Sequence, residues 1–526
     1  SEDYDVPSDF GSDELKDSYS EGSNFAIGTS WIRNDGYIGI AYSRQESEYG
    51  LPGHSHANGV CHTHGIDLHC EAHGIYADAF LGMDDSHTAY IKLNNERIDI
   101  RADYKDLFQG IAQTRLRLSY TDYEHDEMDG DTQFASYANE VYDGLIELTH
   151  KPLLGFIGTF GIQYSEGTFS GLNLDNEHQG RTSHDLITKN VGVFLSEKRS
   201  FGALEIELAV RKDWQKIHAD KLADNECWGL EDTEFPPEWI VMMENYYDDY
   251  FEGAYPTSKQ KPFSASLGFT WQLGDGYSTG LVLNRSQRAP SVRELYANGN
   301  NLSTNSYEVG LASSSFVSET FPENSTDFVE TTKSVDLVLK KTGGQVEFEV
   351  GIFYQNVDDY IFARLIEEEQ VGDITHRYLL YTAADTAFAG IDGQISYHYS
   401  PTSRITLFGD YVDADLKAEN DNLPRIPPGR LGVRYNYTEG LLSADVEYAK
   451  TFAQNDIALY ENRTSSYNML NFTVAYQLEL SSGNDASVYL RGTNLTDELA
   501  YTHTSFVKDQ SPLRGRNVVL GMRYSF

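Results

Sequence analysis

The sequence predicts an all-β protein, and more narrowly an antiparallel β-barrel that crosses a membrane. Two observations lead to this fold class. Apolar residues alternate with small or polar ones with a period of two along the 526-residue chain, and tight turns alternate with long polar connections. A third observation, the number of predicted strands, indicates the size of the barrel.

The C-terminal segment shows the alternation most clearly. From Val518 to Phe526 every even-numbered residue is apolar or aromatic, whereas the odd-numbered ones include Gly521, Arg523 and Ser525. Residues 37–43 alternate in the same way. One face of such a strand suits lipid and the other is small or polar, which is typical of membrane barrels. A soluble β-sandwich could turn the apolar face inward, so alternation alone leaves both folds open.

The connections favour the membrane barrel. Tight turns are predicted where Gly, Asn, Asp and Pro supply the required backbone angles, at 34–36, 151–155, 274–276, 342–344, 401–403 and 438–440. Long polar connections are predicted near residues 50–95, 125–135, 166–185, 219–260, 291–325, 363–375, 419–429, 455–465 and 501–513. Short turns at one end and long loops at the other form the asymmetry of a bacterial outer-membrane barrel.

Nineteen strands are predicted, near residues 23–33, 37–49, 96–105, 111–124, 136–149, 153–165, 186–195, 202–217, 261–273, 277–289, 326–341, 345–362, 376–399, 404–418, 430–437, 441–453, 466–479, 486–500 and 514–526. The first must run from the long-loop side to the short-turn side, and the last ends on the short-turn side. An antiparallel barrel that starts on that same side needs an odd number of further strands upstream. About three more would give the 22 strands of the plugged outer-membrane transporters.

Composition excludes several function classes. The chain has 40 Lys and Arg against 81 Asp and Glu, a net charge of -41, which disfavours nucleic acid as a partner because phosphate binding needs a basic face. Acidic loops would attract cations, although solubility or a saline habitat would explain the same charge. The sequence has no apolar run long enough for a transmembrane helix. It also lacks a Gly-x-Ser-x-Gly elbow, a His-Glu-x-x-His motif and a Walker A motif, so we expect neither an enzyme nor a catalytic cofactor.

One short stretch is rich in metal ligands. Six of the fifteen histidines and two of the three cysteines lie within residues 54–73, namely His54, His56, Cys61, His62, His64, His69, Cys70 and His73. Imidazole and thiolate suit zinc better than calcium or magnesium. Several histidine pairs compete, so no single tetrahedral set stands out, and metal capture by a loose loop is the favoured interpretation. A pH-sensitive loop or a merely polar composition would explain the same residues.

The chain resembles the TonB-dependent outer-membrane receptors over essentially all of its length. The matching segments are Gly36-Tyr-Ile-Gly-Ile-Ala-Tyr-Ser-Arg44, Tyr49-Gly-Leu-Pro-Gly53, Gln287-Arg-Ala-Pro-Ser-Val-Arg-Glu-Leu-Tyr-Ala-Asn-Gly299, Asn494-Leu-Thr-Asp497 and the strand that ends at Phe526. Within the family it is most similar to the zinc-uptake receptors, in which a histidine-rich loop follows the segment that stands here at Tyr49 to His56. Further matches are Cys61, Cys70, Asp122-Tyr-Glu-His-Asp-Glu127, Phe452-Ala-Gln-Asn455 and Tyr501-Thr-His-Thr-Ser-Phe506.

The resemblance implies a 22-strand barrel in the outer membrane of a Gram-negative bacterium. Residues 1–526 would be the barrel domain, with about 19 strands present and with the N-terminal plug and about three first strands missing. Residues 50–95 would be an extracellular His/Cys-rich loop. Zinc would be the transported substrate, and the energy would come from the TonB–ExbB–ExbD complex acting through the plug, which carries the TonB box in this family.

The resemblance also implies where zinc would bind. The loop histidines 54, 56, 62, 64, 69 and 73 would capture the ion, and Cys61 and Cys70 are the pair that could form a disulfide. A second site is expected at the end of a strand, where Glu127 is the leading candidate ligand and His125 its companion, with further carboxylates at Glu124, Asp129 and Asp131. A solvated acidic loop tip would explain the same residues.

Some features depart from the zinc receptors. Those receptors tend to carry a histidine shortly after the segment that contains Glu294 and Tyr296, and Asn298-Gly-Asn-Asn301 stands there instead. His503 is isolated in the last long loop, where a structural role is the favoured interpretation. Two other functions therefore stay open, a receptor for a metal chelate such as a siderophore, cobalamin or haem, and a surface adhesin or docking site for a phage or toxin.

Overall fold

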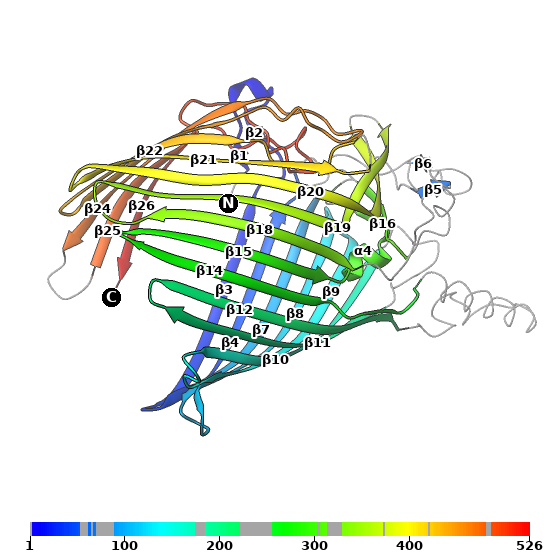
Figure 1. Cartoon of the computed structure of the whole chain (residues 1–526). Coiled ribbons are helices and arrows are strands. Elements are labelled where there is room, and N and C mark those ends of the chain that lie inside the picture. The colour runs from blue at the N-terminus through cyan, green and yellow to red at the C-terminus, as the bar shows by residue number, and fades with distance from the viewer. Residues whose placement is uncertain are drawn as a thin grey trace, which may run out of the picture.

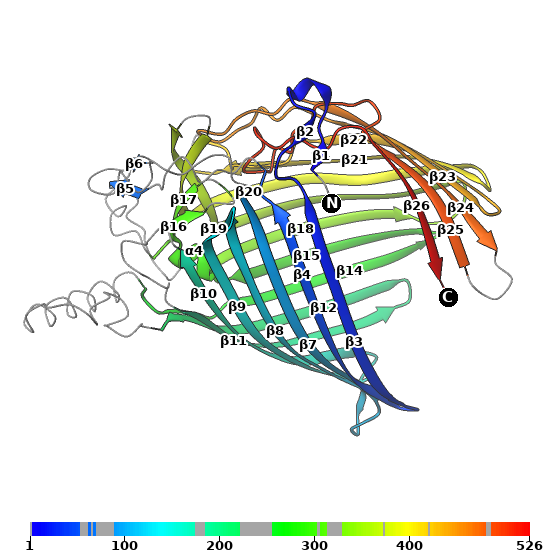
Figure 2. The ribbon, with the colours of Figure 1, turned by 180° about the vertical axis from the view of Figure 1, so that it is seen from behind.

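The computed structural model describes residues 3–52, 62–64, 67–69, 89–173, 185–220, 255–301, 304, 306–312, 329–371, 374–418, 421–479 and 485–525. One large sheet closes into a barrel, and β26 lies next to β3 in its strand order. Figure 1 shows neighbouring strands running side by side through the wall, with short turns joining them on the left. The same order is seen from behind in Figure 2, where β3, β4 and β7–β11 follow one another across the wall.

Setting aside three short strands, the described part of the sheet contains nineteen strands, as the sequence predicts. They are β3 (Ser20–Arg33), β4 (Gly36–Gly50), β7 (Ala89–Lys105), β8 (Ile111–Asp129), β9 (Thr132–His150), β10 (Ile157–Asn173), β11 (Leu186–Phe201), β12 (Leu204–Ala219), β14 (Phe263–Gly274), β15 (Tyr277–Arg288), β18 (Glu330–Lys341), β19 (Val346–Val371), β20 (Ile374–Ser400), β21 (Ser403–Leu416), β22 (Arg430–Glu439), β23 (Leu442–Thr451), β24 (Tyr467–Glu479), β25 (Asp485–Thr493) and β26 (Asn517–Ser525).

Alternation places an apolar face outside and a polar face inside. On β18 the outward side chains of Val335, Leu337 and Leu339 are large, apolar and exposed. Inward residues are charged and paired, as where Arg211 Nη2 lies 2.7 Å from Asp213 Oδ1. Exposed apolar side chains are stable on the outside only against lipid, and charged ones are stable inside only where they are solvated or paired.

The short turns lie where the sequence predicts them. Gly274, Asp275 and Gly276 all have positive φ, of 91°, 51° and 81°. Such angles cost little for Gly and are tolerated by Asp, so this segment reverses the chain directly between β14 and β15.

Two of the predicted long loops are instead extended hairpins. Residues 125–135 were expected to form a loop, but β8 and β9 stay paired up to Asp129 and Thr132. Residues 363–375 were also expected to form a loop, but β19 and β20 stay paired up to Val371 and Ile374. A segment with polar residues on both faces resembles a loop in the sequence. Beyond the membrane, however, a strand can keep its backbone hydrogen bonds while its two faces contact water or other parts of the protein.

The connection between β15 and β18 folds into the mouth of the barrel. It contains the helix α4 (Val292–Tyr296) and the short strands β16 (Asn298–Asn301) and β17 (Ser306–Val309), and β17 pairs in parallel with β20. Leu295 is fully buried in an apolar cluster that joins α4 to inward residues of the wall, at Leu186, Ile217 and Ile361. No helical period was predicted here, because five residues are too few to show one. None of the described helices is long and apolar enough to cross a membrane.

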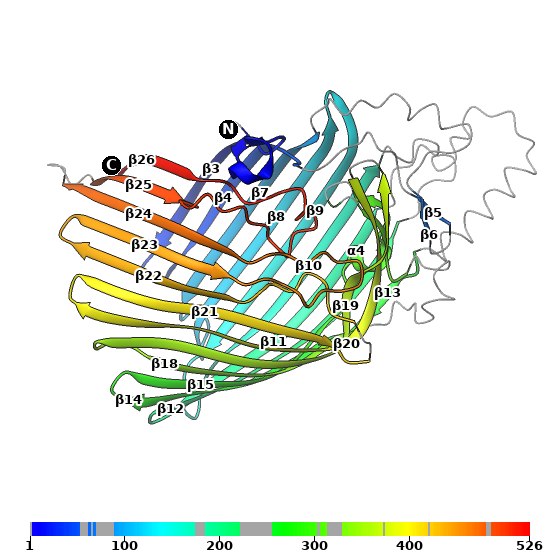
Figure 3. The same cartoon turned by 90° about the horizontal axis from the view of Figure 1, so that it is seen from above.

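The N-terminal segment packs against the last long loop. It contains β1 (Tyr4–Asp5), a 3₁₀ turn (Ser8–Phe10) and β2 (Glu14–Leu15), and Tyr4 Oη donates to the Pro512 carbonyl at 2.9 Å. Gly515 N donates to the Asp5 carbonyl at 2.8 Å. Figure 3 shows the blue N-terminal segment beside the red loop between β25 and β26, so the chain enters β3 from the loop side, as predicted. The remaining short strands are β5 (His62–His64), β6 (Asp67–His69) and β13 (Ser258–Gln260).

The two faces of β18 predict opposite responses to the same substitution. Leu337→Arg would place a cation in the lipid-facing band and should destabilise the folded barrel by about 2–4 kcal/mol. Val338→Arg should be tolerated, because Val338 faces inward between Gly280 and Gly351. Urea midpoints for folding into lipid vesicles would measure both, and equal losses would contradict the assignment of the faces.

Candidate functional site

His125 and Glu127 lie on the inner face of β8, at the loop end of the strand. Outward residues of β8 are even-numbered, as the exposed Leu118 shows, so residues 125 and 127 point inward. His125 is opposite Leu93 of β7 and Tyr137 of β9, and Glu127 is opposite Ile91. A tilted strand crosses the membrane in about 9–11 residues, so both residues stand beyond the membrane-spanning part of this 19-residue strand.

Aromatic rings hold the imidazole of His125. Its ring stacks on Tyr137 with centroids 4.9 Å apart and meets Tyr123 edge-on at 5.5 Å. Phe169 in turn stacks on Tyr137 at 6.3 Å. Burial lowers the pKa of His125, and the charge of Asp126 opposes the shift only in part. A neutral imidazole is the form that binds metal ions.

One imidazole nitrogen of His125 differs in its surroundings from most buried nitrogens. Nδ1 is buried and has no hydrogen-bond partner among the described residues. Buried nitrogens are normally satisfied in folded proteins, so this atom is consistent with a group that binds a further atom.

Glu127 places a carboxylate two residues further along the same inward face of β8. Only 4% of Glu127 is exposed. Burial raises the pKa of Tyr49, and the nearby charge of Glu127 raises it further, which places the Tyr49 phenol in the electrostatic environment of the carboxylate. The sequence predicted the pair His125 and Glu127 but not its aromatic surroundings, because Tyr49, Tyr137 and Phe169 come from three other strands.

The pair does not form a complete metal site within the described residues. No group of three or more His, Cys, Asp or Glu gathers there to hold a metal ion. A zinc ion usually takes four ligands, so His125 and Glu127 could supply two, and the others would have to come from water or from groups outside the described residues.

Most of the predicted capture loop lies outside the described residues, including His54, His56, Cys61, Cys70 and His73. The backbone of β5 and β6 is described, and the two form an antiparallel ribbon. Its register sets residue 62 opposite 69 and residue 64 opposite 67. The predicted metal ligands of this loop, and the predicted disulfide, therefore stay predictions.

Glu294 and Tyr296 have structural roles in α4. Ser291 and Glu294 form a capping box at the start of the helix, and Glu294 also accepts from Arg288 at 2.7 Å. Tyr296 Oη donates to the Pro256 carbonyl at 2.6 Å. These groups are fully used in holding the segment in the mouth.

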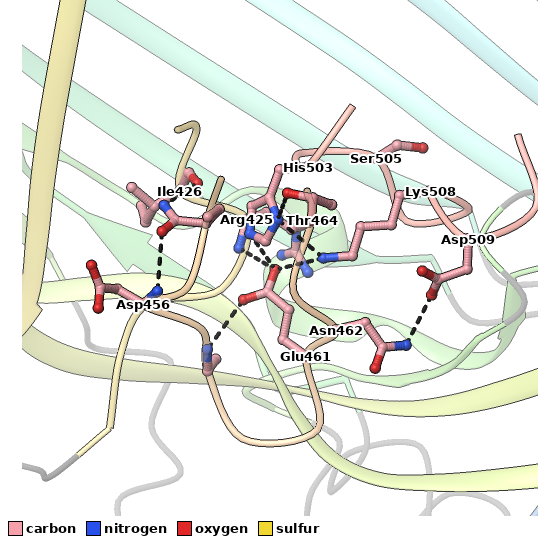
Figure 4. A network of polar contacts seen from close by, with 12 residues as sticks. Arg425, Ile426, Asp456, Glu461, Asn462, Thr464, His503, Ser505, Lys508 and Asp509 are labelled. Carbon is pink, nitrogen blue, oxygen red and sulfur yellow. Dashed lines mark hydrogen bonds and ion pairs between the residues drawn. The ribbon is translucent and has the colours of Figure 1, made fainter. Parts of the chain in front are cut away.

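His503 belongs to a buried polar network that joins three loops (Figure 4). Its Nδ1 lies 3.0 Å from Thr464 Oγ1 and 3.4 Å from Lys508 Nζ, and its Nε2 lies 3.2 Å from Glu461 Oε1. An ammonium group can only donate, so Nδ1 accepts and Nε2 carries the proton. The favoured structural role of His503 fits this burial.

Glu461 is the centre of this network. Its carboxylate accepts from the backbone N–H groups of Arg425 at 2.8 Å and Ala458 at 3.1 Å, and Lys508 Nζ lies 3.3 Å away. Burial alone would raise the pKa of Glu461, but the hydrogen bonds from His503 and the two backbone groups, with the charge of Lys508, lower it to about 2. The sequence could not predict the network, because its members lie in different loops.

Comparison with known proteins agrees with the fold. A closed sheet of mainly antiparallel strands, with a lipid-suited outer face and a polar interior, defines a barrel of the outer membrane. Residues 6–495 match the family described as TonB dependent receptor-like, beta-barrel, and the chain belongs to this family. The protein is therefore a TonB-dependent barrel of the Gram-negative outer membrane, and the members of its family are transporters and not enzymes.

Similar solved structures include several metal transporters. Copper transporter OprC is 14% identical with a TM-score of 0.72, over 100% of this chain and 74% of that one. The FrpB iron transporter from Neisseria meningitidis (F3-3 variant) is 12% identical with a TM-score of 0.68, over 100% and 75%. The ferric citrate transporter FecA is 12% identical with a TM-score of 0.66, over 97% and 70%. At these identities the likeness concerns the fold.

The Glu461 network predicts a specific response to acid. A carboxylate whose pKa is lowered by folding contributes stability that is present above its unfolded pKa and is lost as pH falls through about 2. The shift from the ordinary value corresponds to on the order of 3 kcal/mol. Glu461→Gln should therefore speed backbone hydrogen exchange in residues 421–429, 452–466 and 494–516 at pH 7.

The control is Glu439→Gln, an exposed glutamate that ends β22 beside a short turn at the opposite end of the barrel. Between pH 5 and pH 2 the midpoint temperature of thermal unfolding should fall more steeply with pH in the parent protein than in Glu461→Gln. Equal exchange in these loops for the parent and Glu461→Gln would contradict the structural role of the network.

Proposed function

We propose that this protein imports zinc ions, and that His125 and Glu127 bind the ion inside the mouth of the barrel. The observation that carries the proposal is the placement of a partly buried neutral imidazole beside a buried carboxylate, both inward on β8 and both beyond the membrane. Zinc accepts both nitrogen and oxygen ligands.

In the proposed mechanism, the His/Cys-rich loop collects zinc outside the cell. Loose sites with competing ligands exchange quickly, which suits delivery. The strong negative charge of the chain, -41, raises the local concentration of cations near the mouth. His125 and Glu127 then hold the ion at the junction of barrel and plug, and the energised TonB–ExbB–ExbD complex acts on the plug to open a path.

A second candidate function is import of a negatively charged metal chelate, and Arg425 favours it. Its guanidinium lies 4.0 Å from the ring centroid of Phe506, and among the described residues no carboxylate lies within ion-pair distance of it. Burial lowers the pKa of Arg425 despite the charge of Glu461. A partly desolvated cation without a direct counter-ion attracts anions.

Zinc binding tests the two functions against each other. Deleting residues 54–73 and introducing Glu127→Gln should weaken zinc binding to the full chain by at least about ten-fold, because a lost direct ligand commonly costs more than a lost supporting contact. Isothermal titration calorimetry of the protein in detergent would measure the zinc affinity. Arg425→Gln is the matched variant for the chelate function. Unchanged zinc affinity and unchanged zinc-limited growth would overturn the zinc proposal.

The lowered pKa of His125 predicts a distinct pH dependence. Protons compete with zinc for imidazole, so binding at His125 should persist to a lower pH than binding at ordinary histidines, whose pKa is about 6.5. In the variant without residues 54–73, the pH at which half of the zinc is released should lie below about 6.5. A midpoint at or above that value would contradict the neutral, buried imidazole.

A further inference from the structure

Three lysines stand directly opposite one another near the loop ends of three neighbouring strands. Lys189 of β11 is opposite Lys216 of β12, and Lys216 is opposite Lys259 of β13. The chain has only 40 Lys and Arg against 81 Asp and Glu, so its composition does not favour a row of three lysines. Like charges directly opposite one another destabilise a sheet, and a bound anion would remove that repulsion.

The side chains of this lysine row point outward. The outward residues of β12 are even-numbered, as the exposed Trp214 shows, and those of β11 are odd-numbered, as the exposed Val191 shows. Lys216 and Lys189 continue these two series and are exposed. Lys259 is exposed between two buried neighbours on β13. The three lysines therefore belong to the outer wall of the barrel and not to its interior.

The lysine row lies just beyond the apolar band of the outer wall. Among the described residues of β10, β11 and β12, the exposed apolar side chains end towards the loops in one cross-strand row, at Tyr164, Val191 and Trp214. The next row towards the loops is charged and begins with Glu166, Lys189 and Lys216. Aromatic residues flank the apolar band of a membrane barrel, and its long loops are extracellular. Two residues of a strand span about 7 Å, so the lysines stand at the level of the headgroups of the outer leaflet.

The positive charge of the lysine row is neutralised only in part. Glu166 of β10 is opposite Lys189, and Lys189 Nζ lies 2.8 Å from Glu166 Oε1, so the row contains one carboxylate and three ammonium groups. The next outward residue of β12, at its loop end, responds to this excess. Burial lowers the pKa of His218, the charge of Lys216 lowers it further, and Asp220 opposes the shift only in part.

The surroundings of the lysine row favour a lipid over a free anion. Trp214 and Val191 lie directly below Lys216 and Lys189 on the same outward face. A free anion would meet only the lysines, whereas a lipid can place its acyl chains on the apolar band and its headgroup on the row. We propose that the lysine row binds the phosphate group of a lipid in the outer leaflet, with Lys189, Lys216 and Lys259 as counter-ions. A phosphate accepts charge-assisted hydrogen bonds from several ammonium groups at once.

The test uses the full chain purified in detergent and native mass spectrometry, with diphosphoryl lipid A or its monophosphoryl form as the added lipid. The parent protein should retain the diphosphoryl lipid in preference. Lys216→Gln with Lys259→Gln should weaken that retention by about ten-fold, since two partly exposed ion pairs are lost. Lys216→Arg with Lys259→Arg keeps both charges and should retain the lipid as the parent does.

The matched control is Lys92→Gln with Lys450→Gln, two exposed lysines near the loop ends of β7 and β23. Lys92 stands opposite Glu48 and Asp126 and not opposite other lysines, so this variant should retain the lipid as the parent does. Equal losses in the two glutamine variants, or equal retention of the two lipids by the parent, would overturn the proposal. Displacement of the lipid by inorganic phosphate at matched concentration would also overturn it, because the site would then recognise free phosphate. Zinc affinity should be unchanged in all of these variants, since the lysine row is on the outer wall and the proposed zinc ligands face inward.

Discussion

The rest of the structure depends on one constraint, the pairing of every backbone polar group inside the membrane. Lipid offers no hydrogen-bond partners, so a sheet can cross it only as a closed barrel. Because side chains along a strand alternate between the two faces of the closed sheet, the register then fixes which residue faces lipid and which faces the interior. The exposed Leu337 outside and the ion pair of Arg211 with Asp213 inside are two results of that same register.

Beyond the membrane this constraint relaxes, and the candidate sites lie there. β8 and β9 continue as a paired hairpin, and the inherited register carries His125 and Glu127 inward above the lipid. β21 continues without β22 instead, and the wall opens into a pocket. Continuing the ladder therefore keeps a wall around the interior, whereas ending it on one side opens that wall.

The sequence predicted the features that are local and periodic. Alternation and turn residues gave nineteen strands and the asymmetry of the connections, and the pair His125 and Glu127 could be placed because they are two residues apart on one strand. The aromatic surroundings could not be placed, because Tyr137 comes from β9 and Phe169 from β10. The Glu461 network joins residues from separate loops, and no local pattern relates Glu461 to His503.

The contrast between the buried and the exposed carboxylates explains how so acidic a chain can hold sites of different kinds. Glu461 is buried and accepts hydrogen bonds from three donors, with His503 Nε2 a further 3.2 Å contact, so its charge holds loops together. Asp413, Asp415 and Asp456 are exposed and keep most of their hydration. Because removing a carboxylate from water is costly unless it is paired, burial separates the acids that stabilise the fold from those that can bind. Glu127 is only 4% exposed and stands on the inward face of β8 that also carries His125, so it is the buried acid on which the zinc proposal rests.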